Sequence, residues 1–206
     1  MYRLPAFAED DAETLSALIA AHPLGLLISS GPGGIMAGPI PFQLVTTDAG
    51  RVLRAHLAKA NPQLAEIAAA PQVLVVFQPA EAYVHPGWYP TKAEHHRVVP
   101  TWNYAMVQLR GTARLITDEP FLRAQIDALT HAQEAHRPDA WAVSDAPEEF
   151  IAAQLRGIVG LEIDILSMEG KLKLSQNRGK PDRAGVRAGM MAEGVPLARL
   201  MPDPEA

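Results

Sequence analysis

The hydrophobic pattern is dominated by short segments in which apolar residues run together or alternate with polar ones, as in β strands. QVLVVFQPAEAYV at 72–84 is the clearest, and Leu161 and Ile163 alternate with acidic residues in a later segment. Strands are predicted at residues 24–30, 35–45, 51–57, 72–84, 102–116 and 159–174. The GPGG turn at 31–34 predicts a hairpin. About six antiparallel strands are therefore expected, the first three as a meander.

Helical spacing of apolar residues appears between these strands. Helices are predicted at residues 10–21, 118–136, 147–158, near 181–193, and in the short stretch that begins after Asn61 and ends at Pro71. Asn61 followed by Pro62 is a typical helix start. The fold class is therefore mainly β (α+β), a small antiparallel barrel with flanking helices. Residues 1–170 are predicted to form one domain, with 171–206 as a basic C-terminal extension packed on it.

Composition narrows the class of protein. The 206 residues are 48% hydrophobic and 20% charged, so the chain can bury a sizeable core. The net charge of −5 argues against a nucleic-acid footprint over the whole surface. The lack of cysteine excludes disulfides and Cys-ligated metals. No apolar run is long enough for a membrane span and no signal-peptide pattern opens the chain, so a soluble cytoplasmic protein is expected.

The stretch 83–104 concentrates aromatic residues. It holds two of the three Trp, three of the four Tyr and three of the seven His. Its prolines disfavour regular structure, so it is either a loop packed on its own aromatics or a site for a planar ligand. A second candidate lies at a predicted strand–helix junction, where His56 and Lys59 precede Asn61. Helix N-termini attract anions, although an ordinary capped junction would look the same.

Other chemistry is weakly indicated. The histidines lack metal-ligand spacing, so no metal site is predicted, and the absence of Cys and of a G-x-S-x-G elbow leaves catalytic residues unassigned. Residues 171–187 carry six Lys and Arg opposed only by Asp182. This cluster is interpreted first as a solvated face, then as a site for a ligand phosphate, and last as a nucleic-acid contact. No helix-turn-helix is legible, so DNA stays an option without a motif.

Five segments together resemble one known family. They are FAEDD (7–11), AHLAKANPQ (55–63), residues 82–111, IVGLEIDI (158–165) and KLKLSQNR (171–178). The specific parts are WYPTK (88–92), VPTWNY (99–104) and KLSQNR (173–178). In this order they resemble the PaiB-type FMN-binding negative transcriptional regulators, over nearly the whole chain. The resemblance implies an FMN-binding split β-barrel, related to pyridoxamine-phosphate-oxidase-like and flavin-reductase-like proteins. It also implies a homodimer with FMN at the subunit interface, and a role in gene regulation.

The resemblance assigns candidate FMN-binding residues. Trp88, Tyr89 and Trp102 would contact the flavin ring, and Thr101 and Asn103 its polar edge. The phosphate candidates are His56, Lys59, Asn61, Lys92, Lys173, Gln176 and Arg178. VPTWNY is expected to line the site, whereas HPGWYPTKAEHH (85–96) is expected to be the more exposed part.

Two functions from different classes follow. The first is a flavin- or redox-responsive regulatory protein. The second is an FMN-dependent oxidoreductase, either flavin reductase or pyridoxamine-phosphate-oxidase-like, acting on a small molecule, because flavin itself supplies electron chemistry. A weaker third interpretation keeps the barrel without the cofactor. Whether the protein is an enzyme is left open by the sequence.

Overall fold

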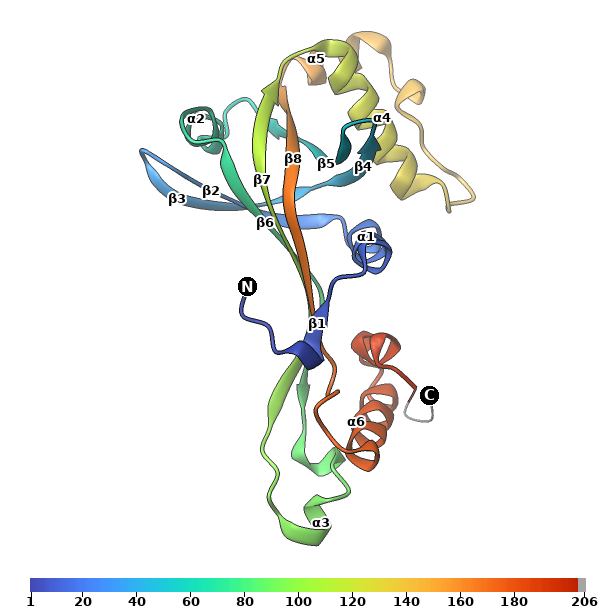
Figure 1. Ribbon diagram of the computed structural model, residues 1–206. Coiled ribbons are helices and arrows are strands. Elements are labelled where there is room, and N and C mark those ends of the chain that lie inside the picture. Colours follow the sequence, from blue (N-terminus) through green and yellow to red (C-terminus); the bar gives the residue numbers. More distant parts are fainter. Residues whose placement is uncertain (204–206) are drawn as a thin grey trace. The chain divides into compact units, whose positions relative to one another are not determined.

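The computed structural model describes residues 1–203, which form two compact units (Figure 1). Unit 1 contains Met1–Ala21, Gln78–Gln108 and the chain from Glu169 onward; unit 2 contains His22–Phe77 and Leu109–Met168. Residues 171–203, expected to be a C-terminal extension, therefore group with the N-terminal residues and the aromatic loop. Three long strands have residues in both units.

The described chain forms an eight-stranded sheet with the order β3-β2-β6-β7-β8-β5-β4, and β1 pairs with β8. The strands are β1 (Ala8–Glu9), β2 (Leu24–Gly31), β3 (Gly34–Pro41), β4 (Gln43–Thr47), β5 (Gly50–Ala58), β6 (Gln72–Val84), β7 (Thr101–Ile116) and β8 (Ile158–Lys173). The pairings of β1 with β8, β2 with β3 and β6, and β5 with β4 and β8 are antiparallel. The predicted mainly β class is confirmed.

The strand count and the meander were wrong. The segment predicted as one strand at 35–45 divides at Phe42, which is buried and meets Phe77 edge-on at 5.8 Å between ring centroids. The two-residue strand β1 was also missed. β2–β3 and β4–β5 are hairpins, but β2 then pairs with β6 and β5 with β8. The two hairpins consequently stand at opposite ends of the strand order.

Helices flank both units. They are α1 (Ala12–Ala21), α2 (Gln63–Ala69), α3 (Lys92–His95), α4 (Glu119–Glu134), α5 (Glu148–Leu155) and α6 (Lys180–Ala192). Short 3₁₀ turns include η2 (Pro86–Trp88) and η4 (Pro196–Leu200). Five of these helices lie where helices were predicted, and α3 falls inside the aromatic loop. Within residues 1–203, no helix has the length and apolar composition needed to cross a bilayer.

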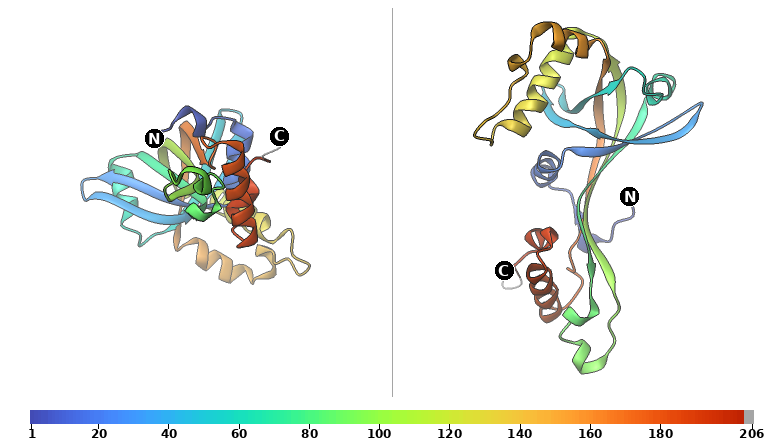
Figure 2. Two further views of the ribbon diagram at one scale, coloured as in Figure 1. Left: turned by 90° about the horizontal axis from the view of Figure 1, so that it is seen from below. Right: turned by 180° about the vertical axis from the view of Figure 1, so that it is seen from behind.

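Each unit has its own buried core. In unit 2 the strands bury alternate side chains such as Leu27, Leu53 and Leu161, and α4 packs on β5 and α5. In unit 1, α6 lies beside the ends of the long strands (Figure 2) and buries Val186 and Met190 against the aromatic loop. The candidate residues for FMN are therefore distributed over two separately packed units.

Candidate functional site

The first candidate group lies at the end of β5 in unit 2. His56 is opposite Gly160 of β8, and its Nδ1 is 2.7 Å from Oε1 of Gln125 on α4. A side chain at position 160 would meet Phe121, since an added Cβ would lie 2.7 Å from Cε1 of that ring. Glycine therefore lets α4 approach the sheet closely enough for Gln125 to reach His56.

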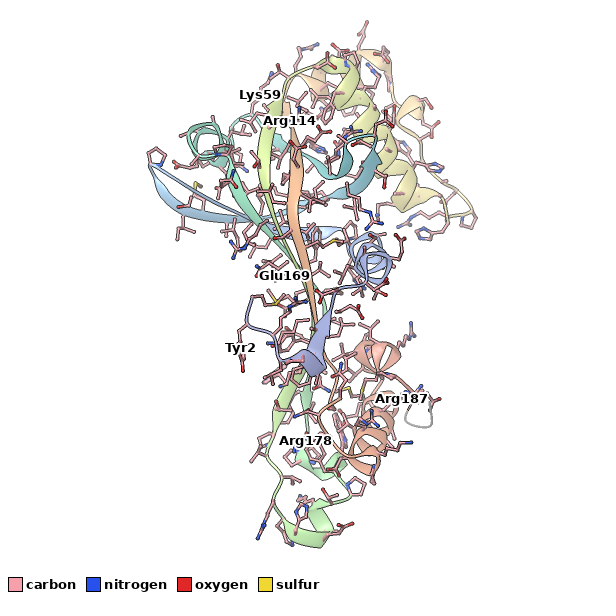
Figure 3. The ribbon with its side chains drawn as sticks, in the orientation of Figure 1. Tyr2, Lys59, Arg114, Glu169, Arg178 and Arg187 are labelled. Atoms are coloured by element: carbon pink, nitrogen blue, oxygen red, sulfur yellow. The ribbon has the colours of Figure 1, made fainter. Side chains whose placement is uncertain are left out.

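Lys59 and Asn61 follow in the turn after β5. The Lys59 amide donates to the Gly157 carbonyl at 2.9 Å, and its side chain is exposed (Figure 3). Asn61 Oδ1 accepts from the amide of Gln63 at 2.9 Å, and its carbonyl accepts from Leu64 N at 3.1 Å. The predicted capping role of Asn61 is confirmed. Because these first amides of the short α2 are already bonded, its N-terminus offers an anion little, and the side chains of His56 and Lys59 remain the donors.

The second group lies in unit 1, where Lys173 joins two of the motifs. Its Nζ donates to Thr101 Oγ1 and to the Trp102 carbonyl, both at 2.6 Å. Burial lowers the pKa of Lys173, and the positive charges of Lys171 and Arg178 lower it further. The structure thus brings the start of VPTWNY and the start of KLSQNR together through one ammonium group.

Two of the three side-chain amides in these motifs, those of Asn103 and Gln176, are already bonded within unit 1. Asn103 is fully buried and its Nδ2 donates to Ser175 Oγ at 2.9 Å, while its Oδ1 has no partner within residues 1–203. Gln176 holds the turn after β8: its Oε1 accepts from Leu174 N at 2.7 Å and its Nε2 donates to the Leu172 carbonyl at 2.5 Å. Of the two, only Asn103 retains an unsatisfied buried atom.

An exposed face of unit 1 combines rings and ammonium groups. Trp102 is 54% exposed and meets Tyr83 edge-on at 5.9 Å between centroids. Lys171 and Lys173 place Nζ 5.3 Å and 6.0 Å from the centroid of Tyr104. We call Tyr83, Trp102, Tyr104, Lys171 and Lys173 the aromatic–lysine face. Flat rings beside cations are what a planar anionic ligand requires.

Two rings near the start of the aromatic loop, those of Trp88 and Tyr89, instead pack within unit 1. Trp88 covers Gly189 of α6, and Tyr89 is 2% exposed with the Arg178 guanidinium 5.1 Å from its ring centroid. Burial raises the pKa of the Tyr89 phenol, with Arg178 partly opposing. The expectation that residues 85–96 form the exposed part is wrong for Tyr89. It is right for Lys92, which lies exposed on α3.

Sequence reasoning missed Gln125 and Asp182. Gln125 is 3% exposed, four residues after Phe121 on the inward stripe of α4, and a polar residue at such a position was the available signal. Asp182 is buried and accepts from Thr91 N at 3.2 Å and from Thr91 Oγ1, which ties α6 to the loop. No group of three or more His, Asp or Glu side chains in the described chain is placed to hold a metal ion.

Comparison with known families identifies the family of this chain. Residues 1–167 match the family model described as "Putative FMN-binding domain". The chain belongs to this family. The family resemblance and the cofactor predicted from the motifs, FMN, are thereby confirmed.

Relatives and solved structures agree. An uncharacterised protein of Emericella nidulans is 37% identical over 98% of this chain and 94% of its own length. The Protease synthase and sporulation protein PAI 2 of Bacillus subtilis is 28% identical over the same shares of the two chains. The flavocytochrome Anf3 of Azotobacter vinelandii shares the fold with a TM-score of 0.63 at 17% identity, over 84% of this chain and 72% of that one. The predicted split barrel is confirmed.

The residues present fit FMN in their chemistry. The phosphate needs cations and donors, which His56 and Lys59 supply within unit 2. The ring system needs flat apolar surface, which Trp102 exposes. Asn103 Oδ1 and Gln125 Nε2 are buried atoms with no partner in the described chain, and such atoms are uncommon unless a ligand or water completes them.

Proposed function

We propose that this chain is an FMN-binding regulatory protein, a flavin- or redox-responsive negative regulator of transcription. The single observation that carries the binding role is the aromatic–lysine face, where Trp102 is half exposed beside the Lys173 ammonium. The regulatory role is supported by the 28% identity to PAI 2 over 98% of this chain. We propose that the protein acts in the cytoplasm.

FMN would be held by the side chains already named. Each unit offers its own contact, and we propose the two separately. Within unit 2, His56 and Lys59 would bind the phosphate. Within unit 1, Trp102 would stack on the ring and Lys173 would keep a proton at Nζ near its polar edge. When bound, FMN supplies one- and two-electron chemistry. In unit 1 the surrounding polar groups largely satisfy one another, as in the bonds of Lys173 to Thr101 and of Gln176 to the backbone. This self-bonding favours a site built for binding rather than for turnover.

We further propose that the protein is a homodimer with FMN at the subunit interface. Unit 2 exposes large apolar side chains on its strands: Leu24 is 63%, Ile35 78% and Leu166 67% exposed. Single exposed apolar residues are ordinary, but several on one sheet favour a protein partner. A second copy of the chain is the partner proposed, because by symmetry it would bring its own copy of this apolar surface.

The α6 segment supports a contact with the DNA backbone. Lys180, Arg183 and Arg187 follow one another at spacings of three and four residues, so they share one edge of the helix. Asp182, the one carboxylate between residues 171 and 187, is turned inward to Thr91. Arg187 lies on α6 and Arg178 in the preceding turn (Figure 3). Lys180 is exposed, whereas Arg183 and Arg187 are half-buried with Nε inside. The positive charge along this edge suits phosphates and carries no sequence readout.

FMN titration tests the binding role. Flavin fluorescence and thermal melting should both respond, since ligand at a hundred times its Kd stabilises by about 2.7 kcal/mol, or roughly 5–10 °C in a chain of this size. Trp102→Ala should weaken binding about threefold to tenfold through lost stacking. Trp141→Ala is the matched control, because Trp141 is 46% exposed on unit 2 away from the proposed residues. No quenching and no thermal shift with wild type would refute the assignment.

Two further assays separate regulator from enzyme. Duplex DNA should be retained with strong salt dependence, and replacing Lys180, Arg183 and Arg187 by Ala should flatten the salt slope by about one unit per cation removed. Removing Arg110, Arg137 and Arg156, three exposed arginines of unit 2, is the charge-matched control. Rapid anaerobic bleaching of bound flavin by NADH or NADPH, with no DNA retention, would instead establish the oxidoreductase alternative.

A further inference from the structure

Gln125 is a buried polar residue that the binding role does not yet explain. It is 3% exposed on the inward face of α4, its Oε1 lies 2.7 Å from His56 Nδ1, and its Nε2 has no partner in the described chain. A buried unpaired donor is costly, and an apolar residue of similar volume would avoid that cost. Packing alone therefore does not account for glutamine here.

We propose that Gln125 is a positioning residue that holds the neutral His56 ring as its Nδ1–H tautomer, so that His56 binds the FMN phosphate only when the ring is protonated. This inference rests on the proposed role of His56 in FMN binding. A carbonyl oxygen can only accept a hydrogen bond. The neutral His56 ring must therefore carry its proton on Nδ1 in order to donate to Gln125 Oε1. The other ring nitrogen, Nε2, then bears a lone pair.

The contact between His56 and the FMN phosphate would therefore require the His56 ring to take up a proton. A neutral His56 with its lone pair at Nε2 cannot donate to a phosphate oxygen, and the two would repel. Protonation adds a second N–H, and the imidazolium then donates from both nitrogens, to Gln125 and to phosphate. Histidine is the side chain that ordinarily changes charge between about pH 5 and pH 8. FMN affinity would thus weaken as pH rises through neutrality.

The charged groups near His56 do not take over this role. Those on the elements around it include Arg54 on β5, Lys59 in the next turn, Arg123 and Asp127 on α4, Arg156 after α5, and Glu162 on β8. Arg54 bonds Glu162 at 2.7 Å and Arg123 bonds Glu148. Within residues 1–203, the only hydrogen bond of the His56 ring is to the uncharged Gln125.

The first test compares FMN with riboflavin, which lacks the phosphate. The ratio of their affinities, measured by flavin fluorescence at about pH 6.5 and about pH 8.5, isolates the phosphate contact. For wild type the ratio should fall by about tenfold as the imidazolium contact is lost. Gln125→Met should flatten this fall, because the neutral ring can then place its proton at Nε2. Gln125→Glu should keep the ratio high, since a carboxylate stabilises the imidazolium.

Gln108→Met is the matched control. Gln108 is likewise buried with an unpartnered Nε2, but it lies in unit 1 and is not part of the proposed phosphate contact. Its variant should keep the wild-type pH profile. The ionisation of the phosphate itself is common to all variants and cancels in the comparison. Identical profiles for wild type and Gln125→Met would overturn the proposal.

The second test observes the ring without FMN. Two-bond ¹H–¹⁵N correlations of the neutral imidazole distinguish Nδ1–H from Nε2–H, and His56→Asn identifies the signal. Wild type should show Nδ1–H, and Gln125→Met should lose that preference. A wild-type Nε2–H tautomer would overturn the inference even if the variants fail to fold. Absence of FMN binding in wild type at every pH would refute the proposed function, while the tautomer measurement would still decide the role of Gln125.

Discussion

Gly185 on α6 offers a substitution for which helix propensity and packing predict opposite signs. Alanine in a helix interior is about 1 kcal/mol more favourable than glycine, so propensity alone predicts a more stable protein. A Cβ at position 185, however, would lie 2.1 Å from the carbonyl oxygen of Trp88 and 2.9 Å from Cδ of Pro90. The Trp88 carbonyl oxygen belongs to the backbone and cannot turn aside like a side chain. The whole loop segment must therefore shift away from α6.

Overpacking of this kind costs about 1–3 kcal/mol, and separating the loop also loosens Tyr89 and the bond from Thr91 to Asp182. After the propensity gain of about 1 kcal/mol is subtracted, we expect Gly185→Ala to lower the free energy of unfolding by up to about 2 kcal/mol. In a chain of this size that corresponds to a fall of up to roughly 8 °C in Tm. Urea unfolding and thermal melting would measure it.

Two companion variants sharpen this test. Gly179→Ala should change stability by less than about 0.5 kcal/mol, because the nearest atom to its added Cβ is Cδ of Pro181 at 3.8 Å. Gly189→Ala should be milder than Gly185→Ala, since its Cβ meets the Trp88 indole, a side chain that can shift. A Gly185→Ala protein more stable than wild type would refute the argument, and with it the close packing of the loop on α6.

Three further outcomes are expected. Asp182→Ala should lower stability by about 2 kcal/mol in urea unfolding, because the half-buried Thr91 amide and hydroxyl lose a charged acceptor. An unchanged midpoint would contradict this role of Asp182. Glu162→Gln should lower the free energy of unfolding by about 2 kcal/mol, because the Glu162 carboxylate is 8% exposed and lies between two arginines. Asp164→Asn should lower it by less than about 1 kcal/mol, because the Asp164 side chain is 52% exposed. Equal losses for the two variants would refute this distinction. Burial lowers the pKa of Lys173 in the folded protein below its ordinary value of 10.5. Holding the charged ammonium in this place therefore costs stability, and the cost is relieved as the pH rises toward 10.5 and the folded protein releases the proton first. Wild type should therefore gain Tm relative to Lys173→Met between neutral and alkaline pH, and a constant difference would show that the burial has no such effect.

Local sequence signals predicted the elements well. β6 spans Gln72–Val84 as its run of β-branched residues indicated, and α6 begins one residue before the expected position. These features depend on neighbours within a few residues, which the sequence displays directly. The chain reversal at Phe42 was missed because a buried aromatic inside an apolar run looks like one more strand residue. Only its contact with Phe77 shows why the strand ends there.

The candidate site was predicted less completely than the fold. The motifs correctly identified residues that associate, as with Lys173 and Thr101. They did not show that Tyr89 would be buried under α6, because that depends on a helix about a hundred residues later. Gln125 was missed for the same reason: its partner, His56, is 69 residues away. Pairings at such separation leave no periodic trace in one sequence.

The division of the chain has a consequence for synthesis on the ribosome. Unit 2 is complete once residue 168 has emerged, whereas unit 1 needs Met1–Ala21, the aromatic loop and α6 together. Its N-terminal ammonium pairs with Glu169, at a separation of 168 residues. Long-range contacts of this kind close late and slow folding. Residues 1–21 must therefore wait for the chain from Glu169 onward, and a chain stalled before α6 would leave the aromatic loop uncovered and prone to misassembly.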